Sequence, residues 1–491
     1  MTIPLDCGKD NPVPVRAASI LTAGSDIVAI ESKGNMVNVV AKTYVNACRV
    51  LVIGLDCAAP RFIFGLDAFD LPNIRGVMER GSWGLLESCH PPITIPAWAC
   101  MTTGKDPGEL GCYGFRNRAD YSYGAMVAAN GATINAPRVW DPLSRQGKQC
   151  IVVGVPQTYP PRPLNGCLVS GIDTPDTSVD YTYPKSLKKE IERAVGEYIP
   201  DVRDFRTDDK AGLLARIYAL MENRFAAAQY LMKNKPWDFF MMVEMGMDRL
   251  HHAFWKYCDP SHPKYLEGNP FSNVFREYYR AVDDQIGELL AIAGDDTTLF
   301  IVSDHGAKAM RGGLRLNQWL ENEGYLKFAV PPTPGMRIED CAVDWPNTRV
   351  WSAGGYYARL FLNVAGREPQ GCVQLDHYES LRNELITKIA SIPGPAGEPL
   401  QNRVLKPEDL YNQVHGVPPD LLVYPDDLNW RAIGTLGHET IYTDENDTGP
   451  DDANHDYHGI LIATDKAPAV EQPVATQPIL SVCDRIIASF M

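Results

Sequence analysis

The chain has 491 residues, of which 45% are hydrophobic and 22% are charged, the balance of a globular protein rather than of a disordered or fibrous one. Its 46 Lys and Arg residues are outnumbered by 61 Asp and Glu residues, which gives a net charge of −15. Because nucleic-acid backbones are bound by basic surfaces, this charge argues against a nucleic-acid polymer as a partner. An acidic protein can still bind phosphate esters where metal ions reverse the local charge.

The cysteines and the N-terminal sequence together predict a cytoplasmic protein. The 12 cysteines are scattered without a CxxC pair, and several lie in apolar runs as small buried residues, which favours a reducing compartment. The N-terminus lacks a charged region followed by a clean apolar run, and no apolar run reaches about 18 residues. We therefore expect no membrane span, although a soluble enzyme can still act on a lipid-linked substrate.

Residues 1–48 differ from the sequence that follows. The segments Ser25–Ser32 and Asn35–Lys42 alternate with a period of about two and flank Lys33-Gly34, a plausible hairpin turn. The segment is expected to be an N-terminal β-rich extension, with a poorly ordered leader as the alternative. If the hairpin pairs with a neighbouring chain, the protein is a homo-oligomer, which the sequence leaves open.

The main domain opens with Arg49–Asp56, a continuous apolar run that ends in an acid. This pattern is typical of a buried parallel strand with a functional residue at its carboxyl end. Further apolar runs and helical patterns alternate along the chain, so we predict an α/β fold with a mostly parallel central sheet sandwiched between helices. In such folds, ligands bind beyond the carboxyl ends of the strands. The other predicted strands are 149–155, 237–243, 298–303 and 459–463, and the predicted helices are 211–233, 273–293 and 478–489.

A long insertion is predicted to divide this domain. Residues 307–450 are richer in Pro and Gly and have shorter, more alternating segments, which favours a cap or lid over the site. The catalytic core would then comprise residues 49–306 and be completed by residues 451–491.

Four separated segments carry the candidate chemistry. They are Gly54-Leu-Asp56, then Pro91-Pro-Ile-Thr94-Ile-Pro96-Ala-Trp98, then Asp248-Arg-Leu-His-His252, and Ser303-Asp304-His305-Gly306 with the later Asn454-His455-Asp-Tyr-His458. Carboxylate and imidazole ligands suit zinc or manganese, and the lack of thiolates at these points favours a catalytic metal site. Two residues four apart on a helix face the same way, as Asp248 and His252 would.

Thr94 lies just ahead of a predicted helix with Pro96 in its first turn. The helix end contributes only about 0.3–1 kcal/mol to an exposed negative charge, whereas a metal ion stabilises an alkoxide by several. Thr94 is therefore useful as a nucleophile only where a metal touches it.

The order of these motifs resembles the type I phosphodiesterase/nucleotide pyrophosphatase branch of the alkaline phosphatase superfamily, over about residues 49–491. The resemblance implies a small phosphate-ester substrate and two divalent metal ions, with zinc favoured over manganese. It also implies that Thr94 attacks phosphorus in line, forming a phosphothreonine intermediate that is then hydrolysed. The implied ligands of one metal are Asp248, His252 and His455, and those of the other are Asp56, Thr94, Asp304 and His305.

Two departures from the family pattern limit this transfer. The family places an Asn shortly after a Gly-Ile pair to hold a phosphate oxygen. Here the corresponding Asn is shifted by two places, so Asn117 or Arg116 is only a candidate, and an exposed loop is the alternative. The late histidine could be His455 or His458, and the spacing to Gly459 favours His455.

Several other functions compete with a phosphodiesterase. A phosphomonoesterase would use the same metal centre and remains the main alternative. A metal-dependent mutase would use a serine nucleophile, and a sulfatase would need a C/S-x-P-x-R motif, which Cys57-Ala-Ala-Pro60-Arg61 does not match. A catalytically silent binding protein is disfavoured because all seven expected ligands are present. The leaving group of the substrate is left open.

Overall fold

The structure, a computed structural model, describes residues 49–65, 67–124, 126–466 and 471–491, together with the backbone of three strands before residue 42. The chain divides into two units, Met1–Cys48 and Arg49–Met491. In the first unit, β1 (Thr22–Ala23), β2 (Asp26–Lys33) and β3 (Met36–Ala41) form an antiparallel sheet, in which Lys33 pairs with Met36. The strands β2 and β3 cover most of the two segments that were expected to form the hairpin, and Gly34 of the predicted turn lies outside the described residues.

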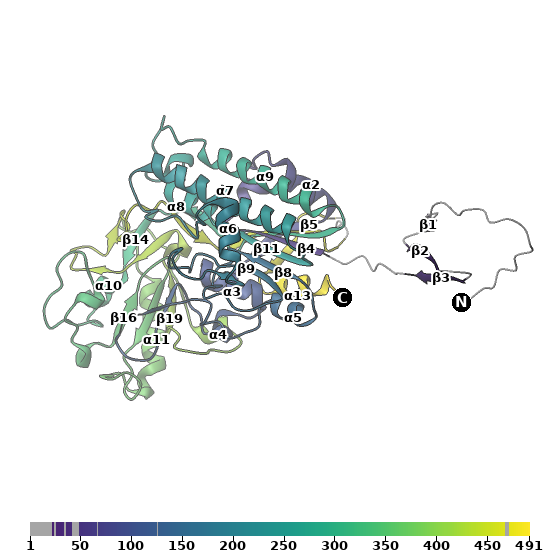
Figure 1. Ribbon diagram of the computed structural model, residues 1–491. Helices are drawn as coiled ribbons and strands as arrows, with labels where there is room; N and C mark the ends of the chain where they lie inside the picture. The colour runs from purple at the N-terminus through teal and green to yellow at the C-terminus, as the bar shows by residue number, and fades with distance from the viewer. Residues whose placement is uncertain are drawn as a thin grey trace, which may run out of the picture. The chain divides into compact units, whose positions relative to one another are not determined.

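A large, mostly parallel sheet forms the centre of the second unit, as predicted (Figure 1). Among its described residues, nine strands follow the order β10-β9-β8-β11-β4-β12-β24-β5-β25, and β24 and β10 run against the others. Their bounds are β10 (Thr182–Tyr183), β9 (Gly166–Val169), β8 (Cys150–Val153), β11 (Phe239–Glu244), β4 (Arg49–Leu55), β12 (Thr297–Val302), β24 (His458–Ala463), β5 (Ser82–Glu87) and β25 (Val474–Pro478).

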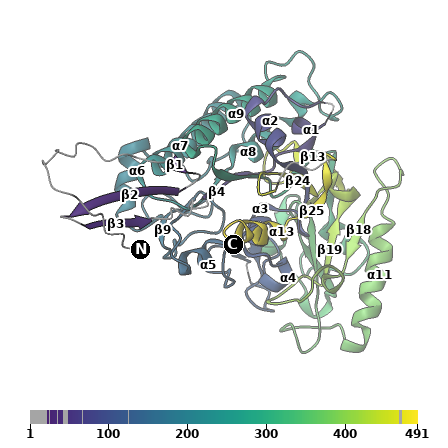
Figure 2. The same cartoon turned by 90° about the vertical axis from the view of Figure 1, so that its right-hand side faces the viewer.

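Helices cover both faces of this sheet (Figures 1 and 2). Apart from Arg49 at the start of β4 and Glu244 at the end of β11, these two central strands are apolar, and they are almost wholly buried, as expected for parallel strands between two helical layers. One face carries α2 (Pro72–Arg80), α7 (Lys210–Asn234), α8 (Gly246–Cys258) and α9 (Val274–Ala293). The other carries α3 (Thr94–Thr103), α5 (Trp140–Arg145) and α13 (Ser481–Ala488).

The segment predicted as a cap has its own sheet and its own hydrophobic cluster. The sheet has the order β16-β17-β19-β18, and β14 joins a second sheet with β20 and β22. All fully buried members of the cluster lie between Leu314 and Leu436. The bounds are β14 (Gly312–Arg315), α10 (Leu316–Asn322), β16 (Val350–Ala353), β17 (Ala358–Leu362), α11 (Tyr378–Ala390), β18 (Arg403–Leu405), β19 (Leu421–Tyr424), β20 (Trp430–Ile433) and β22 (Tyr442–Thr443).

The two ends of this segment lie side by side. The strand β13 (Gly306–Ala309) pairs antiparallel with β23 (Ala453–Asp456), so that Ala307 lies opposite His455. The chain therefore leaves the core and returns to it at neighbouring strands, as expected for an insertion. We keep residues 307–450 as the proposed limits of a cap.

Candidate metal centre

Strand ends and helix starts bring the seven predicted ligands together. Asp56 follows β4, and Asp304 and His305 follow β12, which is parallel to β4. Thr94 is the first residue of α3, with Ile93 as its N-cap, so it lies inside the helix rather than just ahead of it. The remaining three ligands come from α8 and from β23, and all seven side chains are buried.

Three of these side chains form a first cluster of possible metal ligands. The Nε2 atoms of His252 and His455 are 3.2 Å apart. The Oδ1 atom of Asp248 is 3.3 Å from the first of them and 3.6 Å from the second. A tetrahedral zinc site with bonds of about 2.0–2.1 Å has edges of about 3.3 Å between its ligand atoms. The three atoms thus have the spacing that one metal ion requires.

A second cluster contains the predicted nucleophile. Thr94 Oγ1 lies 3.3 Å from His305 Nε2 and 3.5 Å from Asp56 Oδ1. His305 Nε2 is in turn 3.1 Å from Asp304 Oδ2 and 3.9 Å from Asp56 Oδ1. These separations again approximate the edges of a single coordination site. His305 also lies near the ligand atoms of Asp248 and His455, so the two clusters adjoin.

The outer nitrogen of each imidazole is held by the protein. Nδ1 of His252 lies 2.7 Å from Asp451 Oδ1, Nδ1 of His455 lies 2.8 Å from the carbonyl of Pro92, and Nδ1 of His305 lies 3.1 Å from that of Gly306. An acceptor at Nδ1 fixes the tautomer that presents the Nε2 lone pair inward, as in most histidine metal sites.

Asp451 is a buried residue that the sequence motifs did not reveal. Besides the Nδ1 atom of His252, its carboxylate receives hydrogen bonds from Arg431 at 2.6 Å and from Arg206 at 3.1 Å. Two arginines therefore hold the group that orients His252. No short motif encodes this contact, because Arg206 precedes α7 and Arg431 lies in β20 of the proposed cap.

Two buried carboxylate oxygens support the presence of cations. Asp248 Oδ1 and Asp304 Oδ2 accept no hydrogen bond from any described residue, although each lies within one of the clusters. The other oxygens are occupied: Arg249 donates to Asp248 Oδ2 at 2.5 Å, and the backbone N–H of Cys57 donates to Asp304 Oδ1 at 3.1 Å. A buried carboxylate oxygen without a partner is costly, so these residues fit a pair of divalent ions.

The pKa shifts of the residues in the two clusters also favour a bound cation. Burial and the nearby charge of Asp248 raise the pKa of Asp56, and burial together with Asp56 raises the pKa of Asp304. Burial also lowers the pKa of His305 to about 4 and holds that of His455 well below its ordinary value. The carboxylates thus repel one another while the two imidazoles stay neutral, which is the state that binds a cation.

Asp248 and His252 form a pair that attracts positive charge. Burial works against the ionised form of Asp248, but His252 and Arg249 outweigh it and hold the pKa of Asp248 well below its usual range. Burial also disfavours a charged His252, but Asp451, Tyr356 and Asp248 outweigh this effect and raise the pKa of its imidazole. A metal ion bound at Nε2 of His252 would be attracted by the same negative charges of Asp248 and Asp451.

Close packing between β4 and α3 explains the Gly54-x-Asp56 motif. Trp98 donates a hydrogen bond of 2.6 Å from its indole to Asp56 Oδ2, leaving Oδ1 directed toward Thr94. A Cβ atom on Gly54 would lie 2.4 Å from the Trp98 ring. Glycine at position 54 therefore permits the tryptophan to hold the carboxylate of Asp56.

The remaining sequence candidates lie elsewhere. Asn117 accepts a hydrogen bond from the backbone N–H of Tyr113 and donates one to the carbonyl of Gly114, so its amide closes a turn. His458 starts β24 opposite Glu87 and belongs to neither cluster of possible metal ligands in the described chain. His251 lies against aromatic rings such as Phe275, with its Nε2 3.2 Å from the Tyr279 hydroxyl.

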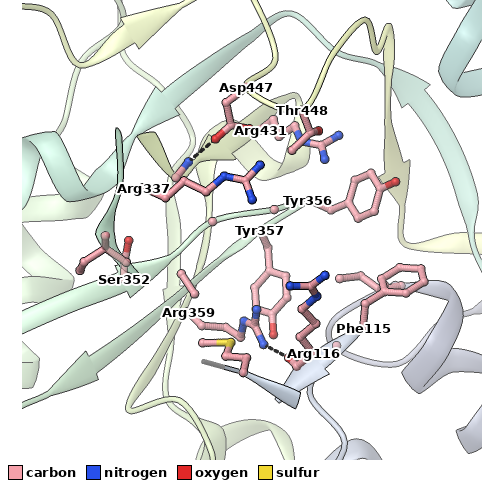
Figure 3. Close-up of a pocket in the computed structure, with 18 of the residues that line it drawn as sticks. Phe115, Arg116, Arg337, Ser352, Tyr356, Tyr357, Arg359, Arg431, Asp447 and Thr448 are labelled. Carbon is pink, nitrogen blue, oxygen red and sulfur yellow. Dashed lines mark hydrogen bonds between the residues drawn. The ribbon is translucent and has the colours of Figure 1, made fainter. Parts of the chain in front are cut away.

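A cavity of about 680 Å³ opens beside the clusters (Figure 3). It is lined by Ile93, which precedes the predicted nucleophile, by Arg116, and by Tyr356 from the proposed cap. The Tyr356 ring stacks on His455 with centroids 4.0 Å apart, so the cavity and the first cluster share a wall. A molecule of ordinary ligand size fits such a space.

Comparison with known families gives a clear result. The profile of the type I phosphodiesterase/nucleotide pyrophosphatase family matches residues 50–451. The chain belongs to this family. It is accordingly a hydrolase that acts on phosphoester bonds. Comparison with curated protein sequences gave no significant match, and no helix among the described residues is long and apolar enough to cross a membrane.

Solved structures share the alkaline-phosphatase-like fold of this family member. Phosphonoacetate hydrolase from Sinorhizobium meliloti 1021, solved with phosphonoacetate, superimposes with a TM-score of 0.56 at 15% identity, covering 94% of this chain and 100% of that one. Human ectonucleotide pyrophosphatase/phosphodiesterase 5 gives 0.52 at 13% identity, covering 90% and 94%. An inactive threonine-to-alanine variant of the murine enzyme, in complex with AMP, gives 0.52 at 13% identity, covering 90% and 95%. At these identities the likeness concerns the fold.

Proposed function

We propose that this family member is a phosphodiesterase that depends on two divalent metal ions and uses Thr94 as its nucleophile. The observation that carries the proposal is that two buried ligand sets, with ligand separations of 3.1–3.9 Å, adjoin at His305, whose Nε2 lies 3.3 Å from Thr94 Oγ1. Asp248, His252 and His455 would hold one ion, and Asp56, Thr94, Asp304 and His305 the other.

The chemistry of the ligands favours zinc, with manganese as the alternative. All the ligand atoms are carboxylate or hydroxyl oxygens and imidazole nitrogens, a set that suits both metals. When bound, such ions act as Lewis acids that stabilise charge on the attacking and leaving oxygens. The protein supplies fixed positions, because each imidazole is held through Nδ1 and Asp56 is held by Trp98.

Thr94 is positioned to attack phosphorus. Its hydroxyl lies at the first turn of α3, where the helix dipole favours negative charge on oxygen. Attack in line would break the bond from phosphorus to the first alcohol, which leaves with the hydroxyl proton, and would join Thr94 to a phosphoryl group that keeps the second ester. Water would then break the new bond, release the phosphomonoester and restore the threonine. The murine relative whose threonine-to-alanine variant is described as inactive supports a comparable role for Thr94.

The other assignments are proposals of the same kind. Arg116 lines the cavity and is the better candidate for a substrate contact, because the amide of Asn117 is occupied by its turn. None of the ten described cysteines is in a disulfide, which supports a reducing, cytoplasmic location. A phosphomonoesterase on the same centre is the second candidate, since the phosphonoacetate hydrolase neighbour cleaves a phosphonate rather than a diester.

The assay that tests the function compares bis-p-nitrophenyl phosphate with p-nitrophenyl phosphate. We expect faster turnover of the diester, dependent on zinc or manganese and abolished by a chelator. Monoester turnover about tenfold above diester turnover, a difference of about 1.4 kcal/mol in barrier, would overturn the diesterase assignment and favour the second candidate. Full diester turnover after complete metal removal would contradict the metal centre.

A further inference from the structure

The cavity beside the metal centre is rich in arginine, although the protein as a whole is acidic. Three of the arginines that line it are neutralised inside the protein. Arg249 pairs with Asp201 and Asp248, while Arg206 and Arg431 both pair with Asp451. These three are paired with carboxylates that form or support the proposed ligand set.

The other three arginines of the cavity lack such partners. Arg116, Arg337 and Arg359 line the cavity, and none of them forms an ion pair with any described residue. Figure 3 shows the guanidinium groups of Arg116 and Arg337 extending into the space between the labelled side chains. These three arginines therefore present positive charge to a molecule bound in the cavity.

Arg359 is the most informative of the three. Its side chain comes from β17, the residue is only 9% exposed, and its Nε atom is buried without a hydrogen-bond partner. One terminal nitrogen donates to the backbone carbonyl of Arg116, which leaves the rest of the guanidinium available. A buried cation without a counter-ion is costly, so this arrangement indicates an anion that is supplied from outside.

Three acids also line the cavity, and they limit what can bind. Glu339 and Asp340 follow Arg337 in the chain and are exposed, and Asp447 accepts a hydrogen bond of 2.8 Å from the backbone N–H of Gly434. They would repel an anion that approached from their side. The lining as a whole is therefore of mixed charge, and only the surroundings of the three arginines favour an anion.

The location of the arginines relates this anion to the substrate. Ile93 in the cavity wall directly precedes Thr94, and Tyr356 in the same wall stacks on His455. We propose that the group bonded to the reacting phosphorus carries a second anionic group, a carboxylate or a phosphate, which Arg116, Arg337 and Arg359 bind. This inference rests on the proposed function, because it assumes that phosphorus is bound at Thr94. Arginine suits the task, since its planar fork binds both anions through paired hydrogen bonds.

The test is a calorimetric titration of the metal-loaded enzyme with three phosphonates of one chain length. Propylphosphonate ends in a methyl group, 3-phosphonopropionate in a carboxylate, and propane-1,3-bisphosphonate in a second phosphonate. We expect at least one of the two anion-ended probes to bind about tenfold or more tightly than propylphosphonate, the effect of a charge-assisted hydrogen bond. The probe that binds more tightly than propylphosphonate shows whether the anion is a carboxylate or a phosphate.

Substitutions locate the effect. The quantity compared is the dissociation constant of propylphosphonate divided by that of the tighter anion-ended probe. Arg359→Gln should bring this ratio close to one. Arg337→Gln, at an exposed position where folding is not at risk, should reduce the same ratio severalfold. Arg193→Gln, on the exposed face of α6 (Leu187–Val195), is the matched control and should leave it unchanged.

The outcomes that contradict the inference are separate from those that contradict the function. Equal binding of all three probes by the unaltered enzyme would overturn the inference and leave the phosphodiesterase assignment intact. A ratio that stays high in both arginine variants would do the same. Binding of none of the probes would overturn the proposed function and the inference with it.

Discussion

At the scale of single residues, the test of the mechanism is Thr94. Its hydroxyl is one of seven proposed ligands, so Thr94→Ala should reduce metal content little. It should lower kcat by roughly 10³-fold or more, because the covalent route is lost. Thr94→Ser keeps the hydroxyl and loses only the methyl group that stiffens the side chain, and it should retain much of the activity. Metal content is measured by plasma mass spectrometry and kcat with bis-p-nitrophenyl phosphate.

Chemical trapping provides a second readout for the same residue. If a diester substrate is trapped on the unaltered enzyme, a phosphoryl group with its remaining ester should be found on the peptide that contains Thr94. Turnover by the alanine variant at the unaltered rate would show that water attacks phosphorus directly, and the threonine mechanism would be wrong.

Asp173 lies apart from the metal clusters and yields a prediction about stability and pH. One carboxylate oxygen accepts a hydrogen bond of 2.8 Å from the backbone N–H of Tyr159, the other is buried without a partner, and burial raises the pKa of Asp173 to about 6. Since the folded state binds this proton more tightly than the unfolded state, the stabilising contribution is complete below about pH 4 and is lost as the pH rises through 6.

Asp173→Asn should therefore raise the free energy of unfolding at pH 8 by about 1–3 kcal/mol. We expect the lower part of this range, because the side chain keeps some exposure. The gain should shrink below pH 6 and be nearly absent at pH 4. Urea unfolding of both proteins at pH 8 and pH 5 measures the difference, with the exposed Asp296→Asn as a control. A gain that is the same at both pH values would show that Asp173 is ionised throughout.

At the scale of elements, two neighbouring strands separate the two late histidines. The pairing of β23 with β13 sets His455 opposite Ala307 and turns its ring toward the first cluster, whereas His458 belongs to β24. His455→Ala should lose metal and activity together, because it removes a proposed ligand. His458→Ala should be much milder and serves as the matched control. Full metal content in the His455 variant would remove this residue from the proposed ligand set.

The sequence predicted the buried central strands well and the outer ones poorly. The apolar runs that became β4, β8, β11, β12 and β24 are almost fully buried, so hydrophobicity alone identifies them. β5 alternates between buried and partly exposed residues, and β25 is a mostly exposed edge strand. The direction of β24 was also not predictable, because an apolar run carries no sign of its orientation and only its pairing with β12 shows that it runs antiparallel.

The same distinction applies to the site. Motif spacing predicted residues that the structure brings together, since most of them lie at or next to the end of a regular element and His252 lies one helical turn after Asp248 in α8. The residues around them could not be found this way. Asp451 and its arginine partners come from three distant segments, and Tyr356 reads from the sequence as an ordinary aromatic of an alternating strand. Their roles depend on tertiary contacts that have no local pattern.

At the scale of the whole molecule, the proposed cap and the core each supply part of the substrate cavity. Arg337 and Arg359 come from the proposed cap, while Ile93 and Arg116 come from the core. The proposed metal ligands all come from the core side of the chain. Under the proposed function, the metal ligands would thus lie in the core, whereas two of the three arginines proposed to bind the leaving group would lie in the cap.

The last prediction concerns the N-terminal unit, residues 1–48. Arg49–Met491 forms a unit of its own, and every proposed ligand lies at or after Asp56, so a chain that begins at Ala47 should fold without the first unit. It should contain both metals and hydrolyse bis-p-nitrophenyl phosphate at a rate within about twofold of the full chain, because independent units contribute separately to stability. Sedimentation of both proteins provides the control, since a hairpin that pairs with a neighbouring chain would make only the full chain oligomeric. Loss of metal from the shortened chain would show instead that residues 1–48 support the site.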